Sequence, residues 1–478
     1  MKVALANCGA KRAPPSDSSP VRHNCRMQLS ARARAAVFLL TCLVAGCGGE
    51  PSSDAAALGT SAPECGLTEQ QTWLRNYFND WYYWAAAAPS TAPDGVSTLA
   101  QYFRALLFAG DASAPADRFS NCAPTASFQR QFGDGQALGY GLAVAGQEIL
   151  DRPDAALLVR YVEPGTPAAA AGLQRGDQIL SLNGMDAARL VAARDFGALS
   201  AQAVGQRVDV RWRRGGVDTS TELTAVIYNL NPVQDARLIT LGDGRVVGYV
   251  LVNSMLLQAQ APLDAAFAQF KARGVRDYII DLRYNGGGYV SVGGVLASYL
   301  AGDAAAGKLY ARLQFNSARS SNNLSFNFSP QANGVQARRV YLLAGQRTCS
   351  ASEQVVMGLR GVGVDVVTVG ATTCGKPVGF VPASRCDNTY LVVNFASYNA
   401  AGEGDFYRGL APTCAVDEDF SKPSGLPGDP LLNEALLHLQ TGQCSASALA
   451  LAKRQAMRLW RPAPTAAKDG VELEGMLR

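Results

Sequence analysis

The feature of this sequence that most constrains its fold is an apolar run, a turn and a helical segment at residues 340–360. Residues 340–344 have the length and composition of a buried strand, and residues 351–360 are typical of a helix. Ser350 stands where that helix would begin. The unpaired N–H groups and the positive dipole end of a helix favour negative charge there. The pattern therefore predicts a serine hydroxyl presented at the end of a sheet, where developing negative charge is stabilised.

A serine nucleophile needs a base, and the composition limits the choice. The 478 residues include two histidines. His23 lies in a predicted leader and His438 in a predicted amphipathic helix, so a Ser-His-Asp triad is not expected. A buried lysine can have its pKa lowered until it is neutral near physiological pH. Lys376, which follows a predicted strand at residues 364–369, is the candidate base.

Three stretches, taken in order, resemble the carboxyl-terminal processing (tail-specific) peptidases, which are PDZ-containing enzymes with a Ser/Lys pair. The first is PDZ-like, the second is the Asp-Leu-Arg-Tyr-Asn-Gly-Gly-Gly run at residues 281–288, and the third is Ser350-Ala-Ser-Glu353 followed by Gly375-Lys376. The resemblance extends over residues 139–379, about half of the chain. It implies that Ser350 attacks the scissile carbonyl and that Lys376 takes its proton.

The resemblance also implies an oxyanion hole. One N–H group would come from the glycine loop, with Gly287 or Gly288 as candidates, and the other from Ala351. Better-known members of the family have a glutamine four residues after the lysine, where it is thought to orient the base. Phe380 occupies that position here, so another group would position Lys376. The polar candidates nearby are Ser352, Thr372 and Thr373. Glu353 is interpreted as a first-turn residue that complements the helix dipole.

Residues 135–228 change to strand-like periodicity with glycine punctuation and resemble a PDZ domain. An Asn-Gly pair at residues 183–184 predicts a tight hairpin. In PDZ domains, backbone N–H groups of one loop bind the terminal carboxylate of a peptide that adds as a strand. The matching loop here consists of Leu138, Gly139, Tyr140, Gly141 and Leu142. The alternative is a PDZ domain that only packs internally or gates the active site.

The N-terminal region reads as a targeting segment. Residues 1–26 are interpreted as an over-extended start and residues 27–47 as a lipoprotein signal peptide that ends in a lipobox-like sequence. Cys47 would be acylated, and residues 48–63 would form a flexible tether. An ordinary secretory signal with an incidental cysteine is the alternative. The predicted location is the cell envelope, facing the periplasm, and the residues after Cys47 favour the outer membrane.

Export changes the interpretation of the cysteines, because disulfides persist in oxidising compartments. Seven cysteines follow Cys47, and their spacing fits no zinc pattern, so no metal or cofactor is implied. If the Ser/Lys pair forms, Cys349 and Cys374 are drawn together and a bridge between them is expected. The other expected pairings are Cys65 with Cys122 and Cys386 with Cys414. Spacing alone leaves the connectivity open.

Charge argues against a nucleic-acid partner. The formal net charge is +4, but residues 1–47 contribute +6 and the remainder carries −2. No basic tract with interleaved aromatic residues is present.

The predicted architecture is multidomain α+β. A helical module at residues 64–123 is followed by the PDZ-like domain at 135–228 and an α/β catalytic domain of the crotonase-like, tail-specific protease type at 235–442; residues 443–478 are a tail. In the first module Trp73, Tyr77 and Trp81 form a helical stripe, which would be buried against a neighbouring domain or, alternatively, offer a sugar or peptide platform.

The predicted function is that of a lipid-anchored periplasmic serine endopeptidase acting on proteins or peptides with apolar C-termini. The first alternative is a catalytically weak or inactive PDZ-containing scaffold that binds peptides, and the second is a serine hydrolase of esters or glycans. The missing glutamine favours the scaffold, whereas the presence of both Ser350 and Lys376 favours the enzyme.

Overall fold

The computed structural model describes residues 65–89, 95–150, 152, 154–457 and 475–477. By their contacts these residues belong to one unit, Ser61–Arg478. The predicted start, signal peptide and tether at residues 1–63 lie outside the described residues. Within the described ranges, none of the helices combines the length and the apolarity needed to cross a bilayer.

A six-stranded sheet with the order β10-β11-β12-β16-β17-β22 forms the centre of the largest part of the chain. Its strands are β10 (Val233–Thr240), β11 (Val246–Val252), β12 (Asp277–Asp281), β16 (Arg339–Ala344), β17 (Asp365–Gly370) and β22 (Cys414–Ala415). β10 is antiparallel to β11, and the remaining neighbours are parallel. Ile280 and Leu342 pack on one face, whereas their neighbours Ile279 and Leu343 pack on the other.

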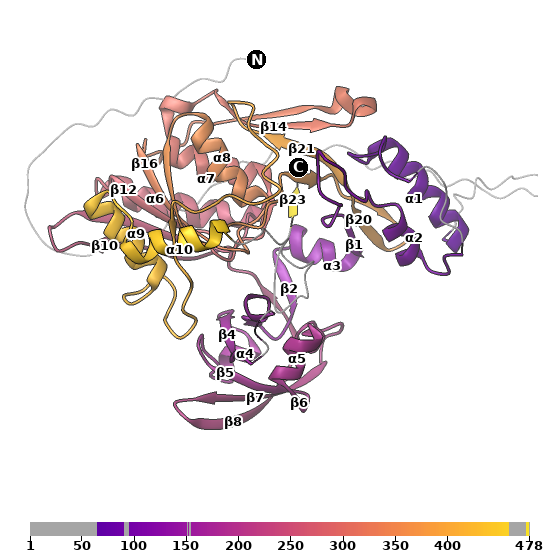
Figure 1. Ribbon diagram of the computed structural model, residues 1–478, viewed down its shortest axis with the longest axis horizontal. Coiled ribbons are helices and arrows are strands. Elements are labelled where there is room, and N and C mark those ends of the chain that lie inside the picture. The colour runs from indigo at the N-terminus through magenta and orange to yellow at the C-terminus, as the bar shows by residue number, and fades with distance from the viewer. Residues whose placement is uncertain (1–64, 90–94, 151, 153, 458–474, 478) are drawn as a thin grey trace, which may run out of the picture. The chain divides into compact units, whose positions relative to one another are not determined.

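Helices cover both faces of this sheet (Figure 1). The first face packs against α6 (Gln260–Ala272), α7 (Val290–Ala301) and α8 (Ala351–Gly361), and the second against α9 (Pro430–Thr441) and α10 (Ala446–Met457). A parallel sheet buried on both faces requires continuous apolar strands, which is what residues 340–344 supply. The expected α+β fold with an α/β catalytic domain is confirmed.

A second sheet has the order β13-β23-β18-β21-β14-β15. Two of its strands lie next to candidate site residues in the sequence. Its strands are β13 (Gly287–Tyr289), β23 (Gly475–Leu477), β18 (Val378–Phe380), β21 (Val393–Tyr398), β14 (Leu309–Phe315) and β15 (Leu324–Asn327). β13 contains the last two glycines of the glycine loop, and β18 begins two residues after Lys376. β23 belongs to the segment expected to be a plain tail.

The N-terminal module contains α1 (Leu67–Trp81), α2 (Leu99–Ala105), β1 (Asn121–Pro124) and α3 (Thr125–Phe128). β1 pairs with β20 (Asn388–Leu391), which pairs with β19 (Ala383–Arg385). The Trp73 ring stacks on the Tyr77 ring, with their centroids 5.3 Å apart, and its centroid lies 5.2 Å from that of Tyr390 in β20. The aromatic stripe is therefore packed against the catalytic part of the chain.

The PDZ-like part has its own apolar core, formed by residues such as Val159, Ile179 and Val208. Its main sheet has the order β3-β4-β5-β7-β8, and β6 pairs with β5. The elements are β2 (Gln136–Gly139), β3 (Leu142–Val144), β4 (Leu157–Val162), α4 (Pro167–Ala170), β5 (Gln178–Leu182), β6 (Met185–Asp186), α5 (Ala187–Ala193), β7 (Arg207–Arg214), β8 (Val217–Thr224) and β9 (Val226–Asn229). Asn183 and Gly184 both have positive φ between β5 and β6, as a tight hairpin turn requires.

Candidate active site

Ser350 lies at the N-cap of α8 in a conformation that few residues other than glycine adopt. Its φ is 63° and its ψ is −117°. Such a backbone costs about 1–3 kcal/mol and persists only where its surroundings hold it. Two neighbouring hydrogen bonds supply that support, because Thr348 Oγ1 donates to Leu282 O at 2.8 Å and Cys349 N donates to Asn285 O at 3.0 Å. The turn is thus anchored to the end of β12 and to the glycine loop.

The Ser350 hydroxyl is fully buried, with 0% of the residue exposed. Among the described residues its Oγ has no hydrogen-bond partner. The structure therefore does not contain a hydrogen bond between Ser350 and the candidate base, Lys376. Hydrogen bonds of this kind are often long in an enzyme without substrate and shorten in the reacting complex.

Glu353 connects the two loops that carry Ser350 and Lys376. Its carboxylate accepts hydrogen bonds from the backbone N–H groups of Ser350 at 2.8 Å, of Gly375 at 2.9 Å and of Lys376 at 2.9 Å, and from the hydroxyl of Thr373. Burial raises the pKa of Glu353, although the four donors favour the ionised form. Glu353 does lie in the first turn of α8, as predicted, but its contacts extend well beyond the helix dipole.

Lys376 is buried, with 3% of the residue exposed. Its Nζ lies 4.1 Å from the ring centroid of Phe380 and 5.5 Å from that of Phe119. Phe380 stands at the position where the family's glutamine is expected from the sequence, so an aromatic face lies beside Lys376 in place of an amide. Phe119 comes from the N-terminal module, and its neighbour Arg118 donates from Nη2 to Cys374 O at 2.9 Å. Phe119 and Arg118 were not identified from the sequence, because no local pattern links these residues to Lys376.

Of the three polar residues expected to position Lys376, Thr373 is the one that binds Glu353, which in turn binds the backbone of Lys376. Thr373 Oγ1 donates to Glu353 and accepts a hydrogen bond from Leu410 N at 2.7 Å. Ser352 Oγ instead donates to Asn285 O at 3.0 Å and thereby supports the glycine loop. Among the described residues of this loop, Thr373, Gly375 and Lys376 donate hydrogen bonds to Glu353, and Thr372 does not.

The glycine loop offers one of its two candidate oxyanion donors. Gly287 N already donates to Asn285 Oδ1 at 2.9 Å, so the expectation that Gly287 supplies a free N–H group is corrected. Gly288 remains the candidate within the loop. Its φ is 131°, and a Cβ atom there would lie 2.4 Å from Met255 O, so only glycine fits. Ala351, the first residue of α8, has an N–H group that helix geometry leaves without an intrahelical partner.

A disulfide joins the two candidate catalytic loops. Cys349 bonds to Cys374 with their Cα atoms 5.2 Å apart, as expected if Ser350 and Lys376 approach one another. The other two expected pairings are wrong. Cys65 is bonded to Cys386, because the N-terminal module packs on the β19–β20 hairpin, and Cys414 is bonded to Cys444. Cys122, expected to pair with Cys65, is a free and exposed thiol.

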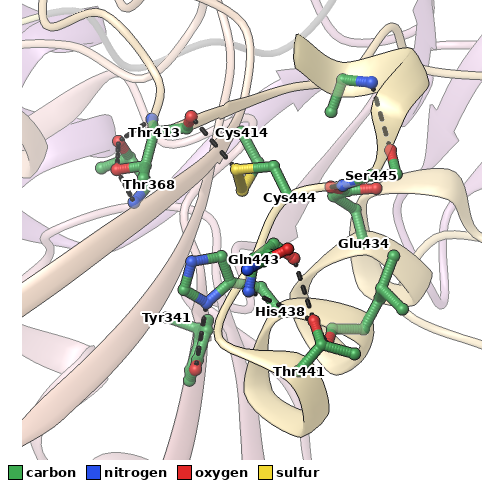
Figure 2. Close-up of a disulfide and its surroundings, with 12 residues drawn as sticks. Tyr341, Thr368, Thr413, Cys414, Glu434, His438, Thr441, Gln443, Cys444 and Ser445 are labelled. Carbon is green, nitrogen blue, oxygen red and sulfur yellow. Dashed lines mark hydrogen bonds between the residues drawn. A yellow bond between two sulfur atoms is a disulfide. The ribbon is translucent and has the colours of Figure 1, made fainter.

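Two clusters in the described residues have a spacing that suits a metal ion. One contains Cys349, Glu353 and Cys374, and the other contains Cys414, His438 and Cys444. Figure 2 shows the second cluster, where the disulfide lies close to the His438 ring. In both clusters the two cysteines are bonded to each other, so the thiolates that would bind a metal are consumed.

A buried ion pair links the PDZ-like domain to the serine loop. Arg347, three residues before Ser350, binds the carboxylate of Glu148 through Nε at 2.5 Å and Nη2 at 2.9 Å. Burial disfavours the ionised carboxylate, but the Arg347 guanidinium outweighs this and holds the pKa of Glu148 below its ordinary value. Glu148 follows β3, which begins at the end of the predicted peptide-binding loop.

The predicted peptide-binding loop spans the end of β2, a turn and the start of β3. Leu138 and Gly139 belong to β2, Tyr140 and Gly141 form the turn, and Leu142 begins β3. β3 is an edge strand of its sheet, and its residues are buried. Gly141 has a φ of 72°, and a Cβ atom there would meet the Thr166 side chain at 2.1 Å.

Asp281 and Arg283 form a structural ion pair rather than a catalytic one. Arg283 Nη2 lies 2.8 Å from Asp281 and 2.5 Å from Asp429, and all three side chains are at most 2% exposed. The Arg283 guanidinium is thus bound by both carboxylates at the end of β12, next to the glycine loop.

Comparisons with known proteins agree with this geometry. The profile of Peptidase family S41 matches residues 246–416, that of the PDZ domain residues 158–214 and that of the Peptidase S41 N-terminal domain residues 69–121. Two curated relatives are carboxyl-terminal-processing proteases. The one from Synechocystis sp. is 28% identical over 53% of this chain and 57% of that protein. The one from Picosynechococcus sp. is 26% identical over 60% of this chain and 66% of that protein.

The chain thus spans less than two thirds of the length of either relative. Among solved structures, a protein assigned to the S41 proteases from Bacteroides fragilis is 26% identical, with a TM-score of 0.61 over 77% of this chain and 97% of that chain. Three successive stretches of the chain therefore match the N-terminal domain of peptidase family S41, a PDZ domain and peptidase family S41 itself, whose members are serine-type peptidases.

Proposed function

We propose that this protein is a serine endopeptidase in which Ser350 is the nucleophile and Lys376 the base. The observation that carries the proposal is the buried carboxylate of Glu353, which accepts hydrogen bonds from the backbone N–H groups of both residues. A nucleophile and a base on separate loops work together only if their relative position is maintained. The Glu353 carboxylate and the Cys349–Cys374 disulfide supply two independent restraints on that position.

The proposed reaction begins when Ser350 Oγ attacks the carbonyl carbon of the scissile peptide bond and its proton passes to Lys376 Nζ. Burial disfavours the charged form of an amine, and a neutral amine is what a base requires. The tetrahedral oxyanion is held by the N–H groups of Ala351 and Gly288. When the C–N bond breaks, the leaving amine takes the proton from Lys376, and water then hydrolyses the acyl-enzyme by the same steps in reverse.

The proposed substrates are proteins or peptides whose apolar C-terminal tails bind the PDZ-like domain. Support comes from β3, which is an edge strand and therefore able to accept a peptide as a further strand. The adjacent loop, residues 138–142, carries the glycines that allow its backbone to approach a carboxylate.

We also propose that the protein is a lipoprotein anchored through Cys47 on the periplasmic side of the envelope. Three disulfides in the described residues support an oxidising compartment. Metabolic labelling with a radioactive fatty acid tests the anchor. Label in the wild-type chain and none in Cys47→Ala is expected, whereas equal labelling would contradict it.

Mass spectrometry of an unstructured reporter with an apolar C-terminal tail tests the peptidase. We expect cleavage by the full chain and a loss of at least about 10³-fold in Ser350→Ala and Lys376→Ala. Two exposed positions provide matched controls, Ser321→Ala and Lys308→Ala, which should retain full activity. Cleavage that survives in Ser350→Ala would contradict the assignment of the nucleophile.

A second candidate function, a peptide-binding scaffold with little or no catalysis, has two observations in its favour. Ser350 Oγ has no hydrogen-bond partner in the described residues, and Phe380 occupies the glutamine position beside Lys376. The same experiment separates the two candidates. If wild type and both site variants bind the reporter tail and none of them cleaves it, the scaffold function is supported and the peptidase function is contradicted.

A further inference from the structure

A strand from the C-terminal part of the same chain lies between the two strands that flank the candidate site. β23, Gly475–Leu477, pairs in parallel with β13 on one side and with β18 on the other. The register places Gly475 opposite Gly287, Met476 opposite Gly288, and Leu477 opposite both Tyr289 and Phe380. Figure 1 marks this short strand in yellow. In the sequence, β23 follows β13 by about 190 residues and β18 by about a hundred.

The position of β23 defines a slot for one extended peptide. In the sheet, β13 and β18 are not neighbours of each other, because β23 stands between them. Neighbouring strands lie about 4.8 Å apart, so the two flanking strands are separated by the width of a single strand. Without an occupant, each would present unpaired backbone N–H and C=O groups along its edge.

Both walls of this slot come from the candidate active site. β13 begins at Gly287 and contains Gly288, the oxyanion candidate, and β18 begins directly after Lys376-Pro377. β23 also contacts α8, whose N-cap is Ser350. A backbone that fills the slot therefore runs past the nucleophile, the base and the glycine loop together.

We propose that the slot between β13 and β18 is a binding site for an extended peptide and that residues 475–477 of this chain occupy it as a tethered competitor of substrate. The occupant is a segment of the protein itself, held by backbone pairing on both sides. Its binding is independent of catalysis, but its role as a competitor rests on the proposed function. The full burial of Ser350 and Lys376 agrees with an occupied site.

The expected strength of the competition follows from the tether. A competing segment that is part of the same chain acts at an effective concentration, for which we take about 1 mM. If the free segment binds with a Kd of about 0.1 mM, the slot is open in about a tenth of the molecules, and turnover is reduced about tenfold.

Hydrogen–deuterium exchange of the full chain locates the occupant. We expect deletion of residues 475–478, or Met476→Pro, to accelerate amide exchange in β13 and β18 and to leave exchange in β3 of the PDZ-like domain unchanged. Proline at 476 removes an N–H donor and is not tolerated between two strands. Ala467→Pro, a proline eight residues before Gly475 in the sequence, is the control. Exchange in β13 and β18 that is unaffected by the deletion overturns the proposal.

A labelled peptide with the sequence of residues 471–478 tests the same site without catalysis. In the Ser350→Ala background, we expect it to bind the deletion variant at least about tenfold more tightly than the undeleted chain, because the tether no longer competes. The peptide carrying proline in place of Met476 should not bind. Equal affinity for the two chains overturns the proposal.

Reporter cleavage distinguishes failure of this inference from failure of the proposed function. The deletion variant should cleave the reporter about tenfold faster than the full chain at low substrate concentration. If exchange and peptide binding behave as expected but no variant cleaves any reporter, the slot stands and the peptidase assignment fails. If full chain and deletion variant cleave at the same rate, the competitor role is overturned while the peptidase assignment stands.

Discussion

The Glu353 carboxylate accepts a hydrogen bond from the backbone N–H of Lys376 at 2.9 Å, across 23 residues of sequence. The same oxygen accepts from Ser350 N at 2.8 Å. One oxygen atom therefore links the helix turn that carries Ser350 to the loop that carries Lys376. This assigns Glu353 a positioning role for both loops, because the contacts are made to backbone rather than to reacting atoms.

Replacing Glu353 by glutamine should lower kcat by about 10²-fold, because a loop displacement of about 1 Å is enough for a loss of that size. The amide of Glu353→Gln turns an NH₂ group toward N–H donors that now lack an acceptor. Steady-state kinetics on the reporter measures the change, and KM should change little because the substrate does not contact this residue.

Glu434→Gln is the matched control for Glu353→Gln. Glu434 is a buried glutamate of α9 that accepts a backbone hydrogen bond from Ser445 N at 2.8 Å, far along the chain from Ser350. Both variants should lose stability, about 1–3 kcal/mol for the donor left unsatisfied. If both lose kcat equally, the positioning role of Glu353 is wrong.

The two short-range disulfides should differ in their effect on activity although they stabilise the fold to a similar extent. Cys349–Cys374 and Cys414–Cys444 span 25 and 30 residues, so the chain entropy that each removes is nearly the same, about 3.5 kcal/mol at 25 °C. We expect Cys349→Ser/Cys374→Ser to lose activity and Cys414→Ser/Cys444→Ser to retain it. Urea unfolding and reporter cleavage, measured on both, provide the comparison, and equal losses of activity would contradict it.

Peptide mapping under non-reducing conditions should recover Cys65 linked to Cys386 and Cys122 as an alkylated thiol. Burial raises the pKa of the Cys122 thiol, so its alkylation should continue to accelerate above the ordinary thiol pKa. Cys122→Ser should leave all three disulfides in place. Recovery of a Cys65–Cys122 link would contradict the described packing of the N-terminal module.

The Glu148–Arg347 pair should make part of the stability depend on acid pH. The folded-state pKa of Glu148 lies below its ordinary value, so the pair's contribution is present above the ordinary glutamate pKa and is lost as pH falls through the lowered one. Arg347→Gln should lower the free energy of unfolding by about 3 kcal/mol at neutral pH, because it leaves a buried carboxylate unpaired.

Urea unfolding of wild type and Glu148→Gln between neutral and acid pH checks the pH dependence. The difference in stability between the two should shrink on acidification, since both then carry a neutral group at position 148. Asp243→Asn, which removes an exposed partner of Arg245, is the control and should show only a small difference throughout. A constant gap between wild type and Glu148→Gln would contradict the assignment.

Sequence reasoning succeeded where the signal lies within a few neighbouring residues. The apolar run ending at Ala344, the turn and the helix starting at Ala351 were all recognisable, because strand and helix periodicities are local properties. The same holds for the Asn183-Gly184 hairpin, whose turn needs two residues that tolerate positive φ. These elements place Ser350 at a helix N-terminus without any knowledge of distant contacts.

The surroundings of the site could not be predicted in this way. Phe119 approaches Lys376 from the N-terminal module, and the partner of Cys65 is Cys386, 321 residues away. Cysteine spacing carries no information on such pairings, because any two thiols that the fold brings together can bond. The pairing of Cys65 with Cys122 was predicted from proximity in sequence, and the packing of the N-terminal module on β20 overrides it.

The sequence by itself determined the candidates for the site: Ser350 at a helix N-terminus, Lys376 as its proposed partner, and a glycine loop that allows close backbone approach. Only the tertiary structure decided how these groups are held, through the Glu353 carboxylate, and what lies in the slot beside them, through the strand Gly475–Leu477. The physical reason is that local propensities set the elements, whereas backbone pairing and burial between distant segments depend on a chain that has already folded.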